Sequence, residues 1–412
     1  MAAIMSLIGI GALLFIAYLL SDNKKAINYR TIFGAFAIQA GLGAFVLYVP
    51  FGKDVLESIS GAVQSVIDSA QAGIDFLFGG LVSGKMFEVF GGGGFVFAFR
   101  VLPIIIFFSS LIAVLYYLGV MQWIIKLIGG ALHKVLRISK PEAMSATANI
   151  FVGQTEAPLV VRPYIPKMTQ SELFAIMVGG LASVAGSVLA GYAGLGVELK
   201  YLIAASFMAA PGGLLMAKMI KPEVEQVVDM DAAIADQDNE NANVIDAAAS
   251  GASSGLQLAL NVGAMLLAFI GLIALMNNLV GYIGGWFGAE NFTIQLILGY
   301  LFAPLAWLIG VPWAEAVQAG SFIGQKLILN EFVAYIDFVG VRDTLSMHTQ
   351  VIVTFALCGF ANLASVAILL GGLGTMAPTR RHDIARLGMK AIAAASLANF
   401  MSAALAGFFI AL

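Results

Sequence analysis

The sequence predicts an all-α polytopic membrane protein with eight transmembrane helices, two opposed re-entrant hairpins and an inverted repeat. Of its 412 residues, 60% are hydrophobic and only 11% are charged, whereas a water-soluble domain has about 25% charged residues. Several apolar segments reach the roughly 20 residues that a membrane-spanning helix needs. Two polar segments, finally, occupy matching positions in the two halves of the chain. An ordinary soluble globule is therefore excluded.

Eight apolar segments have the length and composition of spans. They are residues 2–20, 31–50, 95–120, 171–194, 201–218, 255–280, 349–371 and 390–411. Residues 53–93 mix apolar and acidic residues and run into a glycine stretch at 91–94, which indicates an interfacial helix followed by a loop. Residues 121–139 place their basic residues at near-helical spacing, which predicts an amphipathic helix on the membrane surface.

The basic residues predict the orientation of the chain. Lys24, Lys25 and Arg30 follow the first apolar segment, so this loop is cytoplasmic by the positive-inside rule and the N-terminus lies outside. A cleaved signal peptide would carry its positive charge before the apolar run. Residues 293–311 could be a ninth span. Leaving them out keeps the basic cluster RRHDIAR (380–386) on the inner side, which favours eight spans with both termini on the outer side.

Similar short sequence motifs recur in the same order in both halves of the chain. The pairs are LASVA (181–185 and 363–367), NIFVGQ (149–154) with GSFIGQ (320–325), AASFMAA (204–210) with AASLANFMSAA (394–404), and LGVMQWIIKLIGG (118–130) with LIALMNNLVGYIGG (272–285). The predicted topology gives the two halves opposite orientation. Inverted repeats with broken helices around a central site are typical of secondary transporters.

The repeats and the composition divide the chain into five parts. Residues 1–120 are mainly scaffold helices, 121–218 the first transport repeat, 219–247 an acidic cytoplasmic linker, 248–311 a scaffold span with a connecting apolar segment, and 312–412 the second transport repeat. The simplest interpretation of the acidic linker is a flexible connector without a binding role.

Residues 140–167 and 312–343 are too polar to be plain spans, and we interpret them as hairpins that enter from opposite faces. Each carries a glutamate, Glu156 in the first and Glu331 in the second. A carboxylate at membrane depth costs several kcal/mol unless it is partnered. A functional pair of carboxylates is therefore favoured over structural ion pairs with Lys326 or Arg162.

Neutral polar residues accompany the two glutamates. They are Asn149, Gln154, Thr155, Asn362 and Ser365. Such a set suits an uncharged, polyhydroxylated ligand with an amide-like or heteroaromatic part. Hydrogen bonding between helices is the alternative for Asn362 and Ser365, and simple packing is the alternative for Phe360.

Other chemistries have little support in the sequence. The single cysteine, Cys358, cannot form an internal disulfide, and no Cys/His spacing typical of a metal site occurs. The glycine run at 91–94 lacks the GK[ST] that completes a phosphate-binding loop. A net charge of −3 gives no basic footprint, so nucleic acid is not an expected partner. An intramembrane hydrolase using Glu156 and Glu331 remains an alternative of another class, although no nucleophile motif accompanies the two glutamates.

Five longer motifs carry a family resemblance. They are GQTEAPL (153–159), NEFVAY (330–335), CGFANLAS (358–365), GGLGTMAPTRRHDIARLG (371–388) and GGLVSGKMFEVFGGGGFVFAFRVLP (79–103). The chain resembles the concentrative nucleoside transporters of the bacterial, sodium-coupled branch over essentially its whole length. The resemblance implies a homotrimer in the bacterial inner membrane. It also implies cation-coupled import of uridine-like nucleosides by an elevator-like movement of a transport part past a scaffold.

The resemblance also implies which residues bind the substrate. The base-contacting positions fall on Gln154, Thr155 and Glu156, with Val188 lining the site. The ribose-contacting positions fall on Glu331, Asn362 and Ser365, with Phe360 at the edge of the pocket. Lys326, near the tip of the second hairpin, has no assigned role.

The sodium site that the resemblance implies uses neutral oxygens. The side chains are those of Asn149 and Ser183, and the carbonyls of Val152 and Val184 would complete the shell. Spacing alone favours a different interpretation, in which Asn149 caps the hairpin and Ser183 bonds back to its own helix. Proton coupling through Glu156 or Glu331 is the alternative to sodium.

Overall fold

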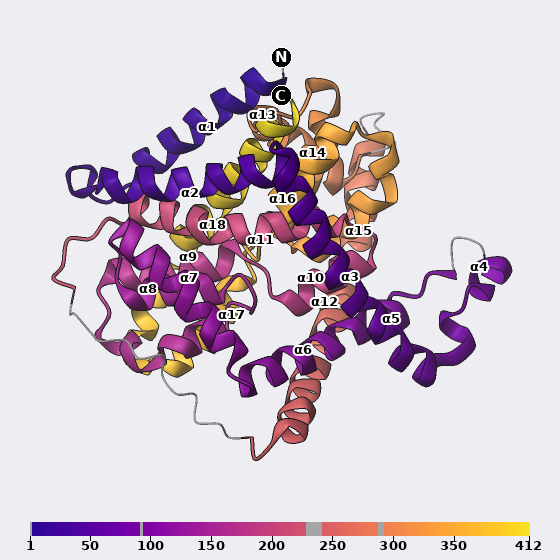
Figure 1. The fold of residues 1–412 in the computed structure, drawn as a ribbon. Coiled ribbons are helices and arrows are strands. Elements are labelled where there is room, and N and C mark those ends of the chain that lie inside the picture. The colour runs from indigo at the N-terminus through magenta and orange to yellow at the C-terminus, as the bar shows by residue number, and fades with distance from the viewer. Residues whose placement is uncertain (1, 91–93, 228–240, 287–291) are drawn as a thin grey trace.

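The computed structural model describes residues 2–90, 94–227, 241–286 and 292–412. Within these ranges every regular element is a helix (Figure 1). Six helical stretches are long and apolar enough to cross a membrane, and a bent helix pair at residues 294–328 adds a seventh if it is counted as one span. The predicted all-α membrane fold is confirmed at this level, and the count of eight spans stays a prediction.

The N-terminal part holds short and long helices that lead into the first repeat. They are α1 (Ala2–Leu19), η1 (Lys24–Ala26), α2 (Tyr29–Leu47), α3 (Pro50–Phe78), η2 (Gly79–Val82), α4 (Lys85–Phe90), α5 (Phe97–Arg100) and α6 (Leu102–Tyr117). The helix expected within 53–93 is α3, and in Figure 1 it leads away from the body toward α4. Of the glycine run at 91–94, the first three residues lie outside the described residues.

The first repeat contains a surface helix, a hairpin and a broken helix. Its elements are α7 (Val120–Leu136), α8 (Lys140–Ala148), the 3-10 helix η4 (Ala157–Lys167), α9 (Gln170–Ala182), α10 (Gly186–Gly194) and α11 (Leu199–Ile220). Helices α8 and η4 are the two arms of the predicted hairpin. The second arm is not α-helical because its prolines lack the N–H groups that an α-helix needs. The predicted span 171–194 is interrupted at 183–185.

The second repeat follows the same plan. It is preceded by α13 (Ile294–Leu308), and its own elements are α14 (Trp313–Ile328), α15 (Glu331–Val341), η5 (Arg342–Thr344), α16 (Met347–Leu357), α17 (Ser365–Met376), η6 (Pro378–Arg380) and α18 (Arg381–Ile410). The second predicted hairpin is α14 and α15, and the predicted span 349–371 is α16 and α17 with a break at 358–364. Helices α13 and α14 enclose a bend of 115°, a geometry that fits a re-entrant turn and fits a broken span equally.

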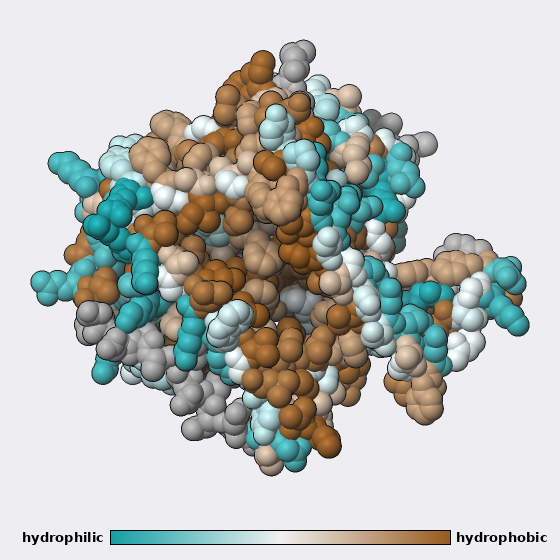
Figure 2. All heavy atoms as spheres, viewed as in Figure 1, coloured by the Kyte–Doolittle hydropathy of each residue, from teal (hydrophilic) through white to brown (hydrophobic). Residues whose placement is uncertain are grey.

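Between the repeats lies α12 (Val244–Gly285), a helix of 42 residues. It begins four residues before the end of the predicted acidic linker 219–247, of which residues 228–240 lie outside the described residues. Helix α12 packs against α6, and most of its surface is exposed and apolar. Figure 2 shows such hydrophobic side chains over much of one face of the molecule. An apolar exterior of this kind suits contact with lipid or with another copy of the chain.

The core lies around α9, α11 and α18, which are almost wholly buried. Helix α1 packs against α18, and α2 packs against α11. Ser6 near the start of the chain faces Gly407 near its end, since a Cβ at Gly407 would lie 3.0 Å from Ser6 Oγ. Both ends of the chain therefore lie on the same side of the molecule (Figure 1).

Local sequence signals determine where the helices of the first repeat begin. Ser139 and Glu142 form a capping box at α8, and Thr169 and Glu172 form another at α9. Each box satisfies backbone N–H groups that the first turn of a helix leaves without partners. Lys218 of α11 forms an ion pair with Glu142, so the start of the hairpin is tied to the buried centre of the repeat.

Candidate functional site

The two hairpin tips and the two helix breaks meet in the middle of the protein. The backbone N–H of Gly186 donates to the carbonyl of Phe151 at 2.9 Å, which joins the first tip to the first break. The N–H of Leu363 donates to the carbonyl of Leu327 at 3.2 Å, which does the same in the second repeat. A third bond, from the N–H of Phe360 to the carbonyl of Ser183 at 3.2 Å, joins the two breaks. The fold thus brings the predicted polar segments together.

Glu331 is the centre of a buried hydrogen-bond group. It is the first residue of α15, after the N-cap Asn330. Its carboxylate accepts a hydrogen bond from the hydroxyl of Tyr192 at 2.9 Å and another from Nδ2 of Asn362 at 3.2 Å. Asn362 in turn is held by Ser365, whose hydroxyl lies 3.1 Å from Asn362 Oδ1. All of these side chains are buried.

Tyr192 was not identified from the sequence. It lies in the glycine-rich span of the first repeat and is completely buried. Its neighbours in the chain are apolar, so nothing in the local pattern sets it apart from a packing residue. A single tyrosine hydroxyl inside an otherwise apolar span needs a hydrogen-bond partner. This requirement is the feature of the sequence that could have identified Tyr192.

Glu156 lies in a different setting. It directly precedes η4, and its side chain is accessible from an open cavity of about 790 Å³. A Cβ at Gly153 would lie 2.5 Å from Glu156 Oε2, so glycine there leaves room for the carboxylate. Thr155 also lines the cavity, whereas Gln154 and Val188 are buried and do not.

The wall of the cavity opposite the first hairpin comes from α6 and α12. It includes Tyr116 and Tyr117 of α6 and a polar stripe on α12 that consists of Ser250, Ser254, Gln257 and Asn261. Sequence reasoning did not single out this stripe, because isolated polar residues in a long apolar helix are weak signals. Glu331, Phe360, Asn362 and Ser365 do not line the cavity. The structure therefore divides the predicted substrate residues between the cavity wall and the protein interior behind it.

Neither glutamate belongs to an ion pair. Within the described part of the chain, no Lys or Arg nitrogen lies within 4.0 Å of the carboxylate of Glu156 or Glu331. No direct contact therefore supports the alternative, in which Lys326 or Arg162 forms a structural ion pair with one of the glutamates. Lys326 instead donates to the carbonyl of Ala356 and to Oδ1 of Asn399, both at 2.7 Å.

Comparison with known proteins places the chain in a family. Residues 201–407 match the family described as Na+ dependent nucleoside transporter C-terminus, residues 8–81 match the corresponding N-terminus, and residues 98–198 match a family described as nucleoside recognition. The chain belongs to the concentrative nucleoside transporters. It is a nucleoside transporter and not an enzyme.

Individual members of the family align with the whole chain. The nucleoside permease NupC of Helicobacter pylori is 53% identical, over 100% of this chain and 99% of that protein. The solved structure of CNTnw in an inward-facing substrate-bound state is 62% identical, with a TM-score of 0.96 over 100% of this chain and 98% of that one. A CNTnw variant in an outward-facing state matches with a TM-score of 0.98, at 62% identity over 100% of this chain and 99% of that one.

The candidate sodium ligands of this transporter include an unsatisfied oxygen. Nδ2 of Asn149 donates to the carbonyl of Ser145 at 2.9 Å, which leaves Oδ1 buried without a hydrogen-bond partner among the described residues. Ser183 donates to the carbonyl of Gly179 at 2.9 Å, as the local alternative predicts, and its oxygen keeps free lone pairs. Hard oxygen donors of this kind suit a hard cation such as sodium. Elsewhere in the described chain, no group of three or more His, Cys, Asp or Glu residues could hold a metal ion.

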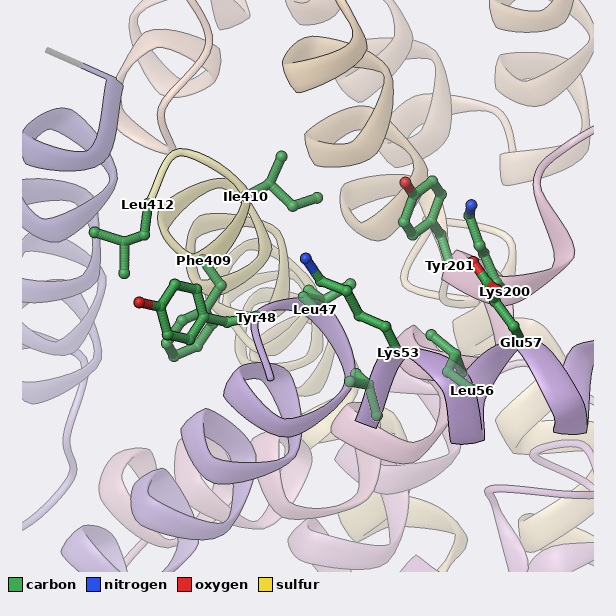
Figure 3. A pocket seen from close by; sticks show the side chains of 11 residues that line it. Leu47, Tyr48, Lys53, Leu56, Glu57, Lys200, Tyr201, Phe409, Ile410 and Leu412 are labelled. Atoms are coloured by element: carbon green, nitrogen blue, oxygen red, sulfur yellow. The ribbon is translucent and has the colours of Figure 1, made fainter. Parts of the chain in front are cut away.

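A second cavity lies far from these residues. It has a volume of about 420 Å³ and lies between the ends of α2, α3, α11 and α18 (Figure 3). Apolar residues such as Leu56 and Ile410 line it, and the charged side chains of Lys53, Glu57 and Lys200 lie around it. None of the predicted substrate or sodium residues of the transporter lies there.

Proposed function

We propose that this protein imports nucleosides together with sodium by an elevator-type movement. The observation that carries the proposal is the buried carboxylate of Glu331, which is held by Tyr192 and Asn362 and, among the described residues, has no cationic partner within ion-pair distance. Such a group is expensive inside a membrane protein. An uncharged ligand rich in hydroxyl groups would use its remaining acceptor capacity.

The two halves of the site would bind different parts of the substrate. Glu331, Asn362 and Ser365 would bind the ribose hydroxyls, with Phe360 at the edge. Gln154, Thr155 and Glu156 would bind the polar edge of the base, with Val188 beside it. The unpartnered Oε1 of Gln154 is one acceptor that a base N–H group could use.

Sodium would be held by Asn149 and Ser183 through their side chains and by Val152 and Val184 through their carbonyls. The ion would supply a positive charge that ties the first hairpin tip to the first helix break. The unpartnered Oδ1 of Asn149 supports this assignment. Proton coupling is the second candidate, because Glu156 faces the cavity and, among the described residues, forms no ion pair.

The packing suggests which parts move. Helices α6 and α12 pack against each other, and we assign them to the scaffold. The two repeats, 121–218 and 312–412, would move past them. Helices α1 and α2 pack against α18 and α11, so we group them with the moving part, although 1–120 had been expected to be mainly scaffold. Inward- and outward-facing structures of CNTnw agree with two such states.

The remaining assignments concern assembly and orientation. The exposed apolar surface of α12 would contact the lipid bilayer or two further copies in a homotrimer. The loop with Lys24, Lys25 and Arg30 would face the cytoplasm, so both termini would lie on the outer side of a bacterial inner membrane.

Uptake into liposomes tests the proposal. Purified protein is reconstituted, and labelled uridine is supplied with a sodium gradient, with a pH gradient, or with neither. We expect accumulation above equilibrium with the sodium gradient alone. Accumulation driven only by the pH gradient would replace sodium with protons, and mere equilibration would contradict active transport of either kind.

A further inference from the structure

Lys326 is a buried cation that the binding of substrate and sodium does not explain. It lies in the last turn of α14 and is completely inaccessible to solvent. Its ammonium group donates to the carbonyl of Ala356 and to Oδ1 of Asn399, both at 2.7 Å, and lies 5.9 Å from the centre of the Phe400 ring. Burying the charge of a lysine costs free energy unless the charge is compensated. The groups that contact the Lys326 ammonium therefore indicate what the residue does.

Asn399 extends these contacts to both helix breaks. Its Nδ2 donates to the carbonyl of Ala182 at 2.7 Å and to the carbonyl of Cys358 at 3.0 Å. Ala182 is the last residue of α9, and Cys358 directly follows α16. Any side chain at position 359 would collide with Asn399, so glycine there admits the asparagine between the two breaks.

The carbonyl groups in these contacts share one property. The last carbonyls of a helix have no N–H partner inside the helix, and they carry the negative end of its dipole. Breaking α9 and α16 in the middle of the protein therefore creates two negative helix ends at buried residues. Lys326 and Asn399 together satisfy Ala182, Ala356 and Cys358, and Lys326 adds a fixed positive charge at this point.

The same lysine is close in the chain to the carboxylate of the site. The residue after Lys326 is Leu327, whose carbonyl accepts the N–H of Leu363 at 3.2 Å. Leu363 follows Asn362, which donates to Glu331. Anchoring α14 at Lys326 thus fixes the second hairpin tip against the break that carries Asn362.

We propose that Lys326 is a positioning residue for the ribose half of the site, acting with Asn399. It fastens the end of α14 to the broken ends of α9 and α16, so that Glu331 and Asn362 stay aligned for the ribose hydroxyls. The proposal rests on the proposed function, in which those two residues bind ribose. Lys326 itself touches no substrate.

The test is the discrimination between uridine and 3′-deoxyuridine or 2′-deoxyuridine by purified protein, measured by calorimetry. In the unaltered protein we expect uridine to bind more tightly than at least one of the deoxy forms. In Lys326→Met, which keeps the length and loses the charge, we expect uridine affinity to fall roughly 10- to 100-fold. Affinity for the deoxynucleoside that binds less tightly should change little. The discrimination ratio, which is the affinity for uridine divided by the affinity for that deoxynucleoside, should therefore move toward one.

Lys218→Met is the matched control, because Lys218 is a second buried lysine whose ion pair is with Glu142. We expect this variant to lower the melting temperature and to leave the ratio unchanged. If Lys326→Met does not fold, Asn399→Ala decides instead, since it frees the carbonyls of Ala182 and Cys358 while the lysine remains. The same fall in the ratio is expected.

Two results would overturn the proposal, and they differ in meaning. If the folded variant keeps the discrimination ratio, with or without an equal loss of affinity for all three nucleosides, Lys326 has no positioning role. If the unaltered protein itself binds all three nucleosides equally, the ribose assignment of Glu331 and Asn362 fails first, and the role of Lys326 fails with it.

Discussion

Tyr192 of α10 donates a 2.9 Å hydrogen bond to Glu331 of α15, so a residue of the first repeat holds the carboxylate of the second. The tyrosine ring is fixed by Tyr335 and Phe332, whose ring centres lie 4.6 and 4.7 Å away. Because Asn362 binds the other carboxylate oxygen, both oxygens of Glu331 are oriented before any ligand arrives. Such preorganisation lowers the cost of binding.

Removing the Tyr192 hydroxyl tests this orientation. We expect Tyr192→Phe to weaken uridine binding by roughly tenfold, because one hydrogen bond to a charged acceptor is lost while the ring still packs. Tyr335→Phe is the control, since the hydroxyl of Tyr335 donates to the carbonyl of Thr354 at 2.8 Å and not to Glu331. Calorimetry with uridine measures both variants. Equal affinities in the two would contradict the role of Tyr192.

Glu331 itself is the stricter test of the ribose site. Glu331→Gln keeps the shape of the side chain but replaces a charged acceptor with an amide. Losing charge-assisted hydrogen bonds costs about 1.5–3 kcal/mol each, and ribose offers more than one hydroxyl, so we expect uridine binding to become undetectable. Binding of labelled uridine to purified protein measures it. Parental affinity in this variant would remove Glu331 from the site.

Much of the candidate site could be predicted because its residues are unusual for a membrane protein and can be recognised from the local sequence. Glu156 and Glu331 stand out because carboxylates are rare at membrane depth. The breaks at 183–185 and 358–364 interrupt segments that the composition predicts as spans. The hairpin arms could be predicted as well, because prolines and caps determine where α8 and α15 begin.

The rest depends on contacts between distant parts of the chain. Tyr192 and Glu331 are 139 residues apart, and Lys326 and Asn399 are 73 apart. No spacing rule connects such pairs, so the partner of Lys326 could not be read from the sequence. The stripe on α12 that faces Glu156 became visible only when α12 and the first hairpin were placed on two sides of one cavity.

Asp22 connects the first loop to both repeats. It forms ion pairs with Lys390 of α18 and with Lys221, whose Nζ lies 3.3 Å away. Burial raises the pKa of Asp22, but hydrogen bonds and charges from Lys390 and Lys221 outweigh it and hold the pKa below its ordinary value of 3.8. Asp22 therefore stabilises the fold above about pH 4, and this contribution is lost as the pH falls through the lowered pKa.

Substituting Asp22 should have a small, salt-dependent effect. We expect Asp22→Asn to lower the free energy of unfolding by no more than about 1 kcal/mol at neutral pH, because the pairs are partly exposed and screened. The loss should shrink in high salt and disappear in acid. Asp343→Asn is the control, since the Asp343 side chain is 96% exposed. Melting curves across pH and salt measure both variants, and a loss that depends on neither salt nor pH would contradict the assignment.

The last prediction concerns the coupling ion. Asn149 has a buried Oδ1 without a partner, and its Nδ2 is already bound to Ser145. An unpartnered buried carbonyl oxygen is costly, and a cation beside it would remove that cost. We therefore expect Asn149→Ala to keep the fold and to abolish the sodium dependence of uridine binding. Thr147→Ala is the control on the same helix, because the Thr147 hydroxyl bonds to Ala143 and lies outside the proposed shell.

Titrating sodium against uridine affinity, with choline as the replacement cation, distinguishes the outcomes. In the parent protein and in Thr147→Ala, affinity should rise with sodium and level off with a Hill coefficient near one, because the proposed shell of neutral oxygens around Asn149 and Ser183 would hold a single ion. Asn149→Ala should bind uridine weakly and equally in both salts. If it keeps the sodium response, the ion binds elsewhere. If the parent protein binds uridine equally in sodium and choline, proton coupling through Glu156 becomes the better explanation, since that carboxylate faces the cavity.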